Sequence, residues 1–239
     1  HLSIRRQRQM CIRDRVVPIT PSCGVCELAR AGLSTLGLRV PAQDAARAVL
    51  QAVGRPIAAP SANRSGHVSP TNADHVLADL GDVIDAVLDA GPCPVGLESA
   101  IIACLGGPPR LLRPGGVTRE AAEAVIGRTL MAGEAGVHLA PGQLASHYAP
   151  NARLRLDADR PAPGEAWLGF GPDHGGTEAG IAAANLSETG DLIEAASNLF
   201  AALRLLDASG AARIAVARIP AHGLGEAIRD RLARAAAPR

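Results

Sequence analysis

The segment at residues 60–71, PSANRSGHVSPT, gathers the side chains best suited to binding an anion. Ser61, Asn63 and Ser69 donate and accept hydrogen bonds, and a predicted helix follows. Amide groups at the start of a helix favour a phosphate or a carboxylate. Ser, Asn, Gly and Pro also form ordinary turns, so composition alone leaves both interpretations open.

Two arginines provide further candidate anion ligands. Arg113 ends a predicted strand before a Pro-Gly-Gly turn, where a guanidinium could clamp a phosphate through two parallel hydrogen bonds. A surface arginine before a turn is the alternative interpretation of Arg113. Arg39 ends another predicted strand before Pro41, where it could hold a carboxylate or pair with Asp44.

Other common catalytic and metal-binding patterns are missing from the sequence. It contains no Lys, which excludes the phosphate-binding Gly-x-x-x-x-Gly-Lys-Ser/Thr loop, and it has no Gly-x-Gly-x-x-Gly or His-Glu-x-x-His pattern. Glu98 and Ser99 do not form a hydrolase nucleophile elbow. Cys23 and Cys26 have the spacing of half a zinc site, but no second Cys or His pair follows at the required spacing. We therefore expect no protein-bound metal site.

Composition narrows the class of protein. The 239 residues are 47% hydrophobic and only 2% aromatic, and their net charge is +1, which predicts a folded chain without tight direct binding of nucleic acid. Five cysteines, an odd number, favour reduced thiols and a cytoplasmic location. No apolar run has membrane-spanning length, so we expect no membrane contact.

Apolar runs and helical patterns alternate along the chain, which predicts an α/β fold. The predicted strands are residues 36–40, 56–59, 83–88, 99–105, 110–113, 166–170 and 213–219. The predicted helices are residues 44–53, 69–80 with Ser69 as N-cap, 118–126 with Thr118 as N-cap, 191–207 and 224–235. The last strand–helix–strand unit predicts a parallel sheet.

Four regions follow from this pattern. Residues 1–15 carry five Arg and no leading Met, and we expect a non-native or disordered tail there. Residues 16–130 form the first α/β domain, residues 131–152 a Gly-, Ala- and Pro-rich linker, and residues 153–239 a smaller α/β domain. The linker contains His147 and Tyr148, which are unusual side chains for a simple tether.

Several ordered motifs resemble the threonylcarbamoyl-AMP synthase family. They are PIAAPSANRSGHVSPT, LDAGPCPVGLESAII, PRLLRPGGVTRE and APGQLASHYAP. The resemblance covers about residues 16–150 and 164–239. It implies an incomplete YrdC-like twisted mixed sheet with helices, then a linker, then a small Rossmann-like α/β domain.

The resemblance also implies a reaction. Threonine and bicarbonate give N-carboxythreonine, which attacks ATP to form threonylcarbamoyl-AMP and pyrophosphate. A partner tRNA threonylcarbamoyl transferase complex then completes the modification of tRNA. Mg²⁺ would accompany ATP and be held largely by its phosphates.

The resemblance implies site residues at matching positions. Those implied to contact ATP are Thr35, Ser61, Asn63, Ser69, Arg113 and Tyr148. Those implied to bind threonine are Arg39, Ala59 and Ser99. The linker, through its Tyr, would act as a lid over the nucleotide.

The chain departs from the family pattern at two places. Ala100 stands where the family usually has Thr, and the family's Lys-x-Arg motif, which contacts ATP, is absent. No catalytic residue is therefore assigned, and we expect N-terminal truncation to impair this chain.

Three alternatives remain open. The first is a related YrdC-like carbamoyl-transfer domain, as in hydrogenase maturation factors, although the linker and the C-terminal domain argue against it. The second is a non-catalytic RNA-binding or regulatory module, which the net charge and the few aromatics disfavour. The third is an inactive fragment.

Overall fold

The computed structural model describes residues 14–18, 35–55, 57, 61–133, 147–172 and 181–238. The chain divides into two compact units that interleave along the sequence. The mixed-sheet unit contains Met10–Ala59 and Glu98–Leu144, and the parallel-sheet unit contains Pro60–Leu97 and Ala145–Arg239. The predicted domain boundaries after residues 15, 130 and 152 stay a prediction.

The mixed-sheet unit is built on five strands in the order β2-β1-β3-β4-β5. They are β1 (Asp14–Pro18), β2 (Thr35–Arg39), β3 (Ile101–Ala103), β4 (Arg110–Arg113) and β5 (Met131–Ala132). Antiparallel and parallel neighbours alternate across this sheet. β1 begins inside the segment predicted to be a tail.

Two helices of this unit have local start and stop signals. In α2 (Asp44–Val53) the Gln43 side chain accepts the amide hydrogen of Ala46, and in α4 (Arg119–Ile126) the Thr118 hydroxyl accepts that of Ala121. Both helices end at a glycine in the left-handed conformation, which costs glycine little. The predicted bounds of these helices are confirmed.

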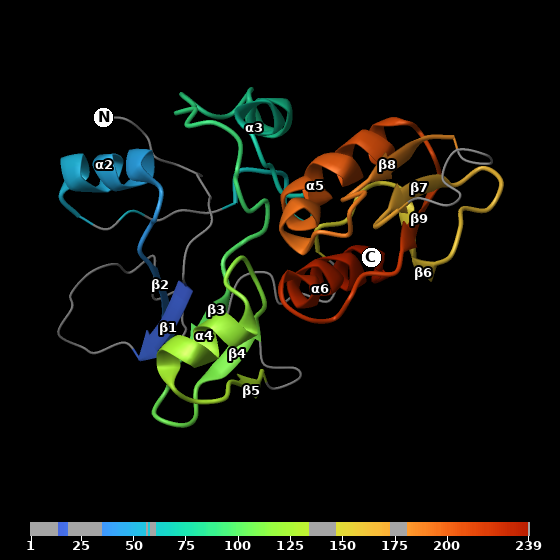
Figure 1. Cartoon of the computed structure of the whole chain (residues 1–239). Helices are drawn as coiled ribbons and strands as arrows, with labels where there is room; N and C mark the ends of the chain where they lie inside the picture. The colour runs from blue at the N-terminus through green and yellow to red at the C-terminus, as the bar shows by residue number, and fades with distance from the viewer. Residues whose placement is uncertain are drawn as a thin grey trace. The chain divides into compact units, whose positions relative to one another are not determined.

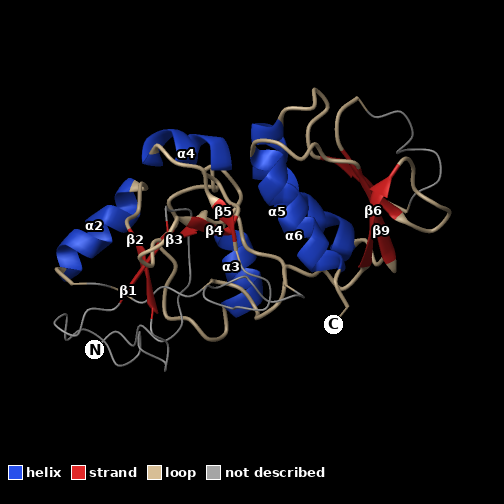
Figure 2. Cartoon of the chain, turned by 90° about the horizontal axis from the view of Figure 1, so that it is seen from below, coloured by secondary structure: helices blue, strands red, loops and turns tan. Residues whose placement is uncertain are grey.

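The parallel-sheet unit has four strands, β6 (Arg153–Ala158), β7 (Ala166–Gly169), β8 (Ala183–Asn185) and β9 (Arg213–Ala217), in the order β6-β9-β7-β8. All paired strands are parallel, as the strand–helix–strand pattern predicts. Helices α5 (Leu192–Ala208) and α6 (Leu224–Ala236) lie side by side on one face of the sheet (Figures 1 and 2). Leu199 and Leu203 of α5 and Ile228 of α6 are buried in one hydrophobic core cluster to which both helices contribute.

Helix α3 (Ala73–Leu80) belongs to the same unit as α5 and α6. The segment that follows α3 packs closely on α5 at Gly96. A Cβ added there would lie 2.5 Å from the carbonyl oxygen of Ala196. Val68 and Leu97 join the core cluster that contains α5. Residues near position 70 are therefore held by the C-terminal part of the chain.

Some predicted elements differ from the structure. Residues 83–88 form no strand, since Val83 and Leu88 are exposed and no described strand satisfies the backbone of this segment. The predicted strand at 99–105 shortens to Ile101–Ala103 and ends before the left-handed Gly106. The prediction for 56–59 falls largely outside the described residues; Ile57 is described and is not in a strand.

The predicted start of helix α3, at Ser69, is also wrong. The helix begins at Ala73, and its N-cap is Asn72, whose side chain accepts the amide hydrogen of His75 at 2.9 Å. Ser69 and Pro70 lie before the helix, in the loop. Within the described ranges, no helix combines the length and the apolar character needed to cross a bilayer.

Candidate functional site

The mixed-sheet unit brings two predicted site residues into direct contact. Arg113 at the end of β4 is 4% exposed, and its Nε and Nη2 donate to the carbonyl oxygen of Ser99 at 3.1 and 2.9 Å. Its Nη2 also lies 3.4 Å from the Ser99 hydroxyl oxygen. A guanidinium held by two hydrogen bonds to one carbonyl has a fixed plane, so its position is defined before any ligand binds.

The turn after Arg113 is pressed onto the backbone around Ser99. A Cβ added at Gly115 would lie 2.2 Å from the amide nitrogen of Ala100 and 2.3 Å from the carbonyl oxygen of Glu98. The Gly116 amide donates to that same carbonyl at 3.0 Å. Only glycine at position 115 permits this approach, which is the physical reason for the Pro-Gly-Gly turn.

Arg39 and Arg113 lie in one register row of the mixed sheet. Arg39 pairs with Asp14, Asp14 pairs with Ile101, and Ile101 pairs with Arg113. Cross-strand partners project to the same face, and three strand spacings separate the two arginine Cα atoms by roughly 14 Å. This row therefore presents two cationic side chains on one face, while Thr35 begins β2 at the opposite end of that strand.

The parallel-sheet unit holds the predicted anion-binding loop, residues 61–72. Asn63 is 7% exposed, and its Nδ2 donates to the carbonyl oxygens of Arg64 and His67 at 3.1 and 2.9 Å. The buried Oδ1 of Asn63 has no hydrogen-bond partner within the part of the chain that the structure describes. Ser69 is buried and Ser61 is half-buried.

The same loop contacts a titratable side chain of α3. The Thr71 amide donates to Nδ1 of His75 at 3.2 Å, so this nitrogen acts as the acceptor. Burial, followed by the nearby positive charge of Arg204, holds the pKa of His75 below its ordinary value. Neutral His75 is therefore the form that fits the folded loop.

Tyr148, predicted to cover the nucleotide, is 1% exposed. Its ring lies 5.7 Å from that of Phe200, and the Arg231 guanidinium lies 5.1 Å from its centroid. The neighbouring amides fix the backbone, since His147 donates to the Arg234 carbonyl at 3.2 Å. In this structure Tyr148 is part of the core, so contact with a ligand would require movement of Tyr148 or of the residues that cover it.

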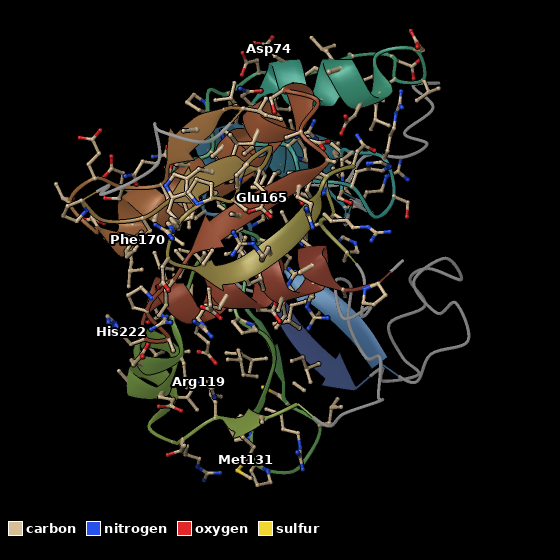
Figure 3. The ribbon with its side chains drawn as sticks, turned by 90° about the vertical axis from the view of Figure 1, so that its right-hand side faces the viewer. Asp74, Arg119, Met131, Glu165, Phe170 and His222 are labelled. Atoms are coloured by element: carbon tan, nitrogen blue, oxygen red, sulfur yellow. The ribbon has the colours of Figure 1, made fainter. Side chains whose placement is uncertain are left out.

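Glu165 belongs to a charged cluster at the parallel sheet of this unit (Figure 3). Glu165 is 2% exposed and accepts hydrogen bonds from Nε and Nη2 of Arg155 and from the amide of Ala162. The hydrogen bond from Arg155 holds the pKa of Glu165 below its ordinary value, although burial opposes this shift. This cluster stabilises the sheet, and no pattern in the sequence predicted it.

The predicted site residues thus divide between the units. Arg39, Ser99, Arg113 and Thr35 lie in the mixed-sheet unit, and Ser61, Asn63, Ser69 and Tyr148 lie in the parallel-sheet unit. Ala59, Cys23 and Cys26 lie outside the described residues. No group of three His, Cys, Asp or Glu side chains that could hold a metal ion occurs within the ranges described.

Two family models match the chain. One, described as "Telomere recombination", matches residues 5–115, and the other, described as "Threonylcarbamoyl-AMP synthase, C-terminal domain", matches residues 117–237. The threonylcarbamoyl-AMP synthase of Bacillus subtilis is 36% identical over 225 residues, which are 87% of this chain and 65% of the relative. That of Pyrococcus abyssi is 36% identical over 221 residues, 85% of this chain and 64% of the relative. The chain thus spans slightly less than two thirds of these relatives.

Solved structures show the same similarity. The crystal structure of P. abyssi Sua5 complexed with L-threonine matches with a TM-score of 0.81 and 33% identity, covering 93% of this chain and 69% of that one. A variant of that protein, in which a His and the Tyr after it are replaced by Ala, matches with a TM-score of 0.80 and 31% identity, covering 93% and 68%.

Proposed function

We propose, from the premise that the chain belongs to the threonylcarbamoyl-AMP synthase family, that it takes part in forming threonylcarbamoyl-AMP and pyrophosphate from L-threonine, bicarbonate and ATP. It would then act as a nucleotidyltransferase. The observation that carries the proposal is the buried Arg113, fixed on Ser99 in the sheet row that also contains Arg39. The relatives are named as synthases, which favours this reading over a non-catalytic RNA-binding or regulatory module.

Threonine would bind at the mixed sheet. Arg39 would hold its carboxylate, since a guanidinium matches the two oxygens of a carboxylate. Ser99 would line the same pocket together with Ala59. The P. abyssi relative was solved with L-threonine, which supports an amino-acid site in this fold.

ATP would contact Arg113, Thr35, Ser61, Asn63 and Ser69. The carbamate oxygen of N-carboxythreonine would attack the α-phosphorus, the bond to the bridging oxygen would break, and its electrons would leave with pyrophosphate. Such a displacement needs positioned groups and neutralised charge more than covalent help from the protein. The buried Oδ1 of Asn63, which has no partner among the residues that the structure describes, and the loop hydroxyls are groups suited to orienting a nucleotide.

Mg²⁺ would reach the site with ATP. The loop offers neutral oxygen donors, which fit an ion that keeps most of its bonds to phosphate and water. When bound, the ion would neutralise phosphate charge. Because Tyr148 is buried, we propose that its contact with the nucleotide requires a rearrangement at this residue or at the residues that cover it.

Further steps belong to other molecules. We propose that a downstream tRNA threonylcarbamoyl transferase complex uses the product, that direct tRNA binding is weak or absent, and that the protein works in the cytoplasm. The net charge of +1 supports weak binding to polyanions.

The proposal is tested by pyrophosphate release from Mg-ATP, with and without threonine and bicarbonate. The 239 residues contain no Lys for the family's Lys-x-Arg motif. We therefore propose slow pyrophosphate release by this chain and faster release by a protein that also includes such a segment. Both proteins should be assayed side by side.

In the protein that includes the Lys-x-Arg segment, Arg113→Lys should abolish pyrophosphate release, because one ammonium cannot reproduce the forked donors of the guanidinium. Arg110→Lys on the same strand is the matched control and should keep activity. Pyrophosphate release that does not depend on threonine and bicarbonate would exclude the synthase function. So would the absence of release from every folded protein tested.

A further inference from the structure

Loop 61–72 is bonded to helix α5 through one side chain. Arg204 of α5 donates from Nη2 to the carbonyl oxygen of Val68 at 2.5 Å and from Nε to that of Ser69 at 3.4 Å. These residues are 136 and 135 positions apart in sequence, yet they belong to the same unit. The contact therefore links the C-terminal part of the chain to the loop.

The same guanidinium is anchored on α3. Nη1 and Nη2 of Arg204 donate to the two carboxylate oxygens of Asp79 at 3.2 and 2.6 Å. The two side chains are only 19% and 14% exposed, so solvent screens this pair less than a surface pair. The carbonyl oxygen of Asp79 also lies 3.4 Å from Nε of Arg64, inside the loop.

We infer that Arg204 is a positioning residue of loop 61–72, through which the C-terminal α/β region sets the affinity for the nucleotide. This inference rests on the proposed function, because it takes that loop as part of the ATP site. Arg204 does not itself need to touch ATP. It acts through the backbone of Val68 and Ser69.

The geometry explains how a carbonyl clamp can order a binding loop. The carbonyl of Val68 and the amide of Ser69 share one rigid peptide plane, so fixing the oxygen also fixes the direction of the N–H. A second donor from the same planar group reaches the next carbonyl, which defines two successive peptide planes. A guanidinium can do this because its donors have a fixed relative geometry, whereas an ammonium cannot.

Further contacts hold the two ends of the loop. The Ala149 amide donates to the carbonyl of Gly66 at 3.0 Å, and the Cys93 amide donates to that of Thr71 at 2.8 Å. Asn63 ties the first turn to itself. Loss of Arg204 should therefore loosen the peptide planes that follow Val68 and Ser69 while both ends of the loop stay attached.

The inference is tested on the full chain with Arg204→Ala, and Arg229→Ala serves as the matched control. Arg229 also joins a carbonyl, that of Ile219 at 2.9 Å, to a carboxylate, that of Asp157 at 3.4 Å. The first measurement is amide hydrogen exchange of peptides from 61–72 without any ligand. Arg204→Ala should raise their exchange rates roughly 10- to 100-fold, the change expected when charge-assisted hydrogen bonds are lost. Arg229→Ala should leave them unchanged.

The second measurement separates positioning from general stability. ATP and threonine affinities are measured by calorimetry on the same variants. Arg204→Ala should weaken ATP binding by about tenfold and leave threonine binding unchanged, because the proposed threonine residues lie in the other unit. Arg204→Lys should restore only part of the ATP affinity. Equal weakening of both ligands would overturn the inference.

Asp79→Asn keeps Arg204 and the side-chain shape, so it provides a test if Arg204→Ala fails to fold. It should raise exchange in the loop by a smaller factor, and unchanged exchange in every folded variant would overturn the inference. Exchange needs no nucleotide, so it decides the positioning role even if the wild-type chain binds no ATP. Failure of ATP binding by the protein that includes a Lys-x-Arg segment would instead count against the proposed function.

Discussion

Replacing Gly115 with alanine tests whether the Arg113–Ser99 contact depends on the close approach of two backbone segments. The added Cβ would lie 2.2 Å from the Ala100 nitrogen and 2.3 Å from the Glu98 oxygen and the Ser99 carbonyl carbon. All three are backbone atoms, so no side-chain rotation can relieve the overlap. Normal van der Waals separation would require the segments to part by about 1 Å.

A shift of that size removes specific bonds. The Arg113 donors, now 3.1 and 2.9 Å from the Ser99 oxygen, would move beyond hydrogen-bonding distance. The bond from the Gly116 amide to the Glu98 carbonyl would be lost as well. Overpacking and a lost charge-assisted hydrogen bond together suggest a destabilisation of about 3–5 kcal/mol. At 2–4 °C per kcal/mol, this lowers the melting temperature by roughly 10 °C.

Thermal unfolding followed by circular dichroism measures the effect, and calorimetry measures threonine affinity, which should fall in parallel. Gly107→Ala is the matched control, because a Cβ there meets no atom within 4 Å. Its free energy of unfolding should change by less than about 0.5 kcal/mol. Equal melting temperatures for the two variants would refute the reasoning that close backbone packing fixes this site.

Three further predictions concern the parallel-sheet unit. Glu165→Gln should lower the free energy of unfolding by about 1–3 kcal/mol at neutral pH, because Arg155 loses its carboxylate partner. Since the folded pKa of Glu165 is lowered, the stability that its charge provides is present above the unfolded pKa of a glutamate and is lost as pH falls through the folded pKa. The free energies of unfolding of the variant and the wild type, measured in urea, should therefore converge at acidic pH, below the ordinary glutamate pKa of about 4.3. His75 has a lowered folded pKa, so wild-type stability should decrease as pH falls below about 6.5, and His75→Asn should remove that dependence in the same titration. Tyr148→Ala should cost about 3–5 kcal/mol in denaturant unfolding without any nucleotide, because its ring packs on Phe200; an unchanged midpoint would contradict the core placement.

Elements with their own local signals were predictable from the sequence. Helix α4 begins at the Thr118 cap and ends at Gly127, and both signals lie within a few residues of the helix. Helix α3 shows the limit of local signals. Ser69 and Asn72 are both favoured N-caps, and only the folded loop selects Asn72. The apolar run at 83–88 failed as a strand because strand propensity says nothing about whether a partner strand is nearby.

Strand β6 has an alternating pattern that predicts a strand, although the sequence analysis did not include it. Its residues alternate between exposed Arg153 and Arg155 and half-buried Leu154 and Leu156, the period of a half-buried strand. Strand β8 is three residues of Ala-Ala-Asn, too short and too small to show any period. Its position follows from pairing with β7 in the folded sheet.

The candidate site also contains parts that the sequence predicted and parts that it did not. The loop with Asn63 and the turn after Arg113 were found because glycines, prolines and polar residues cluster there. The partners that hold them were not found, since Arg204 bonds to the loop across 135 residues and resembles any other arginine on an amphipathic helix. A single sequence identifies the groups that can meet a ligand more readily than those that orient them.

The interleaving of the units also decides how the role of the C-terminal region has to be tested. Deleting residues 153–239 would remove helices α5 and α6 and the core that Val68 and Leu97 join. Loop 61–72 would then lose its packing, so an inactive truncated protein would not show whether the C-terminal region positions the loop or merely keeps it folded. Arg204→Ala leaves that core in place and removes only the hydrogen bonds to the loop and α3. The single substitution therefore separates the two explanations, and the deletion does not.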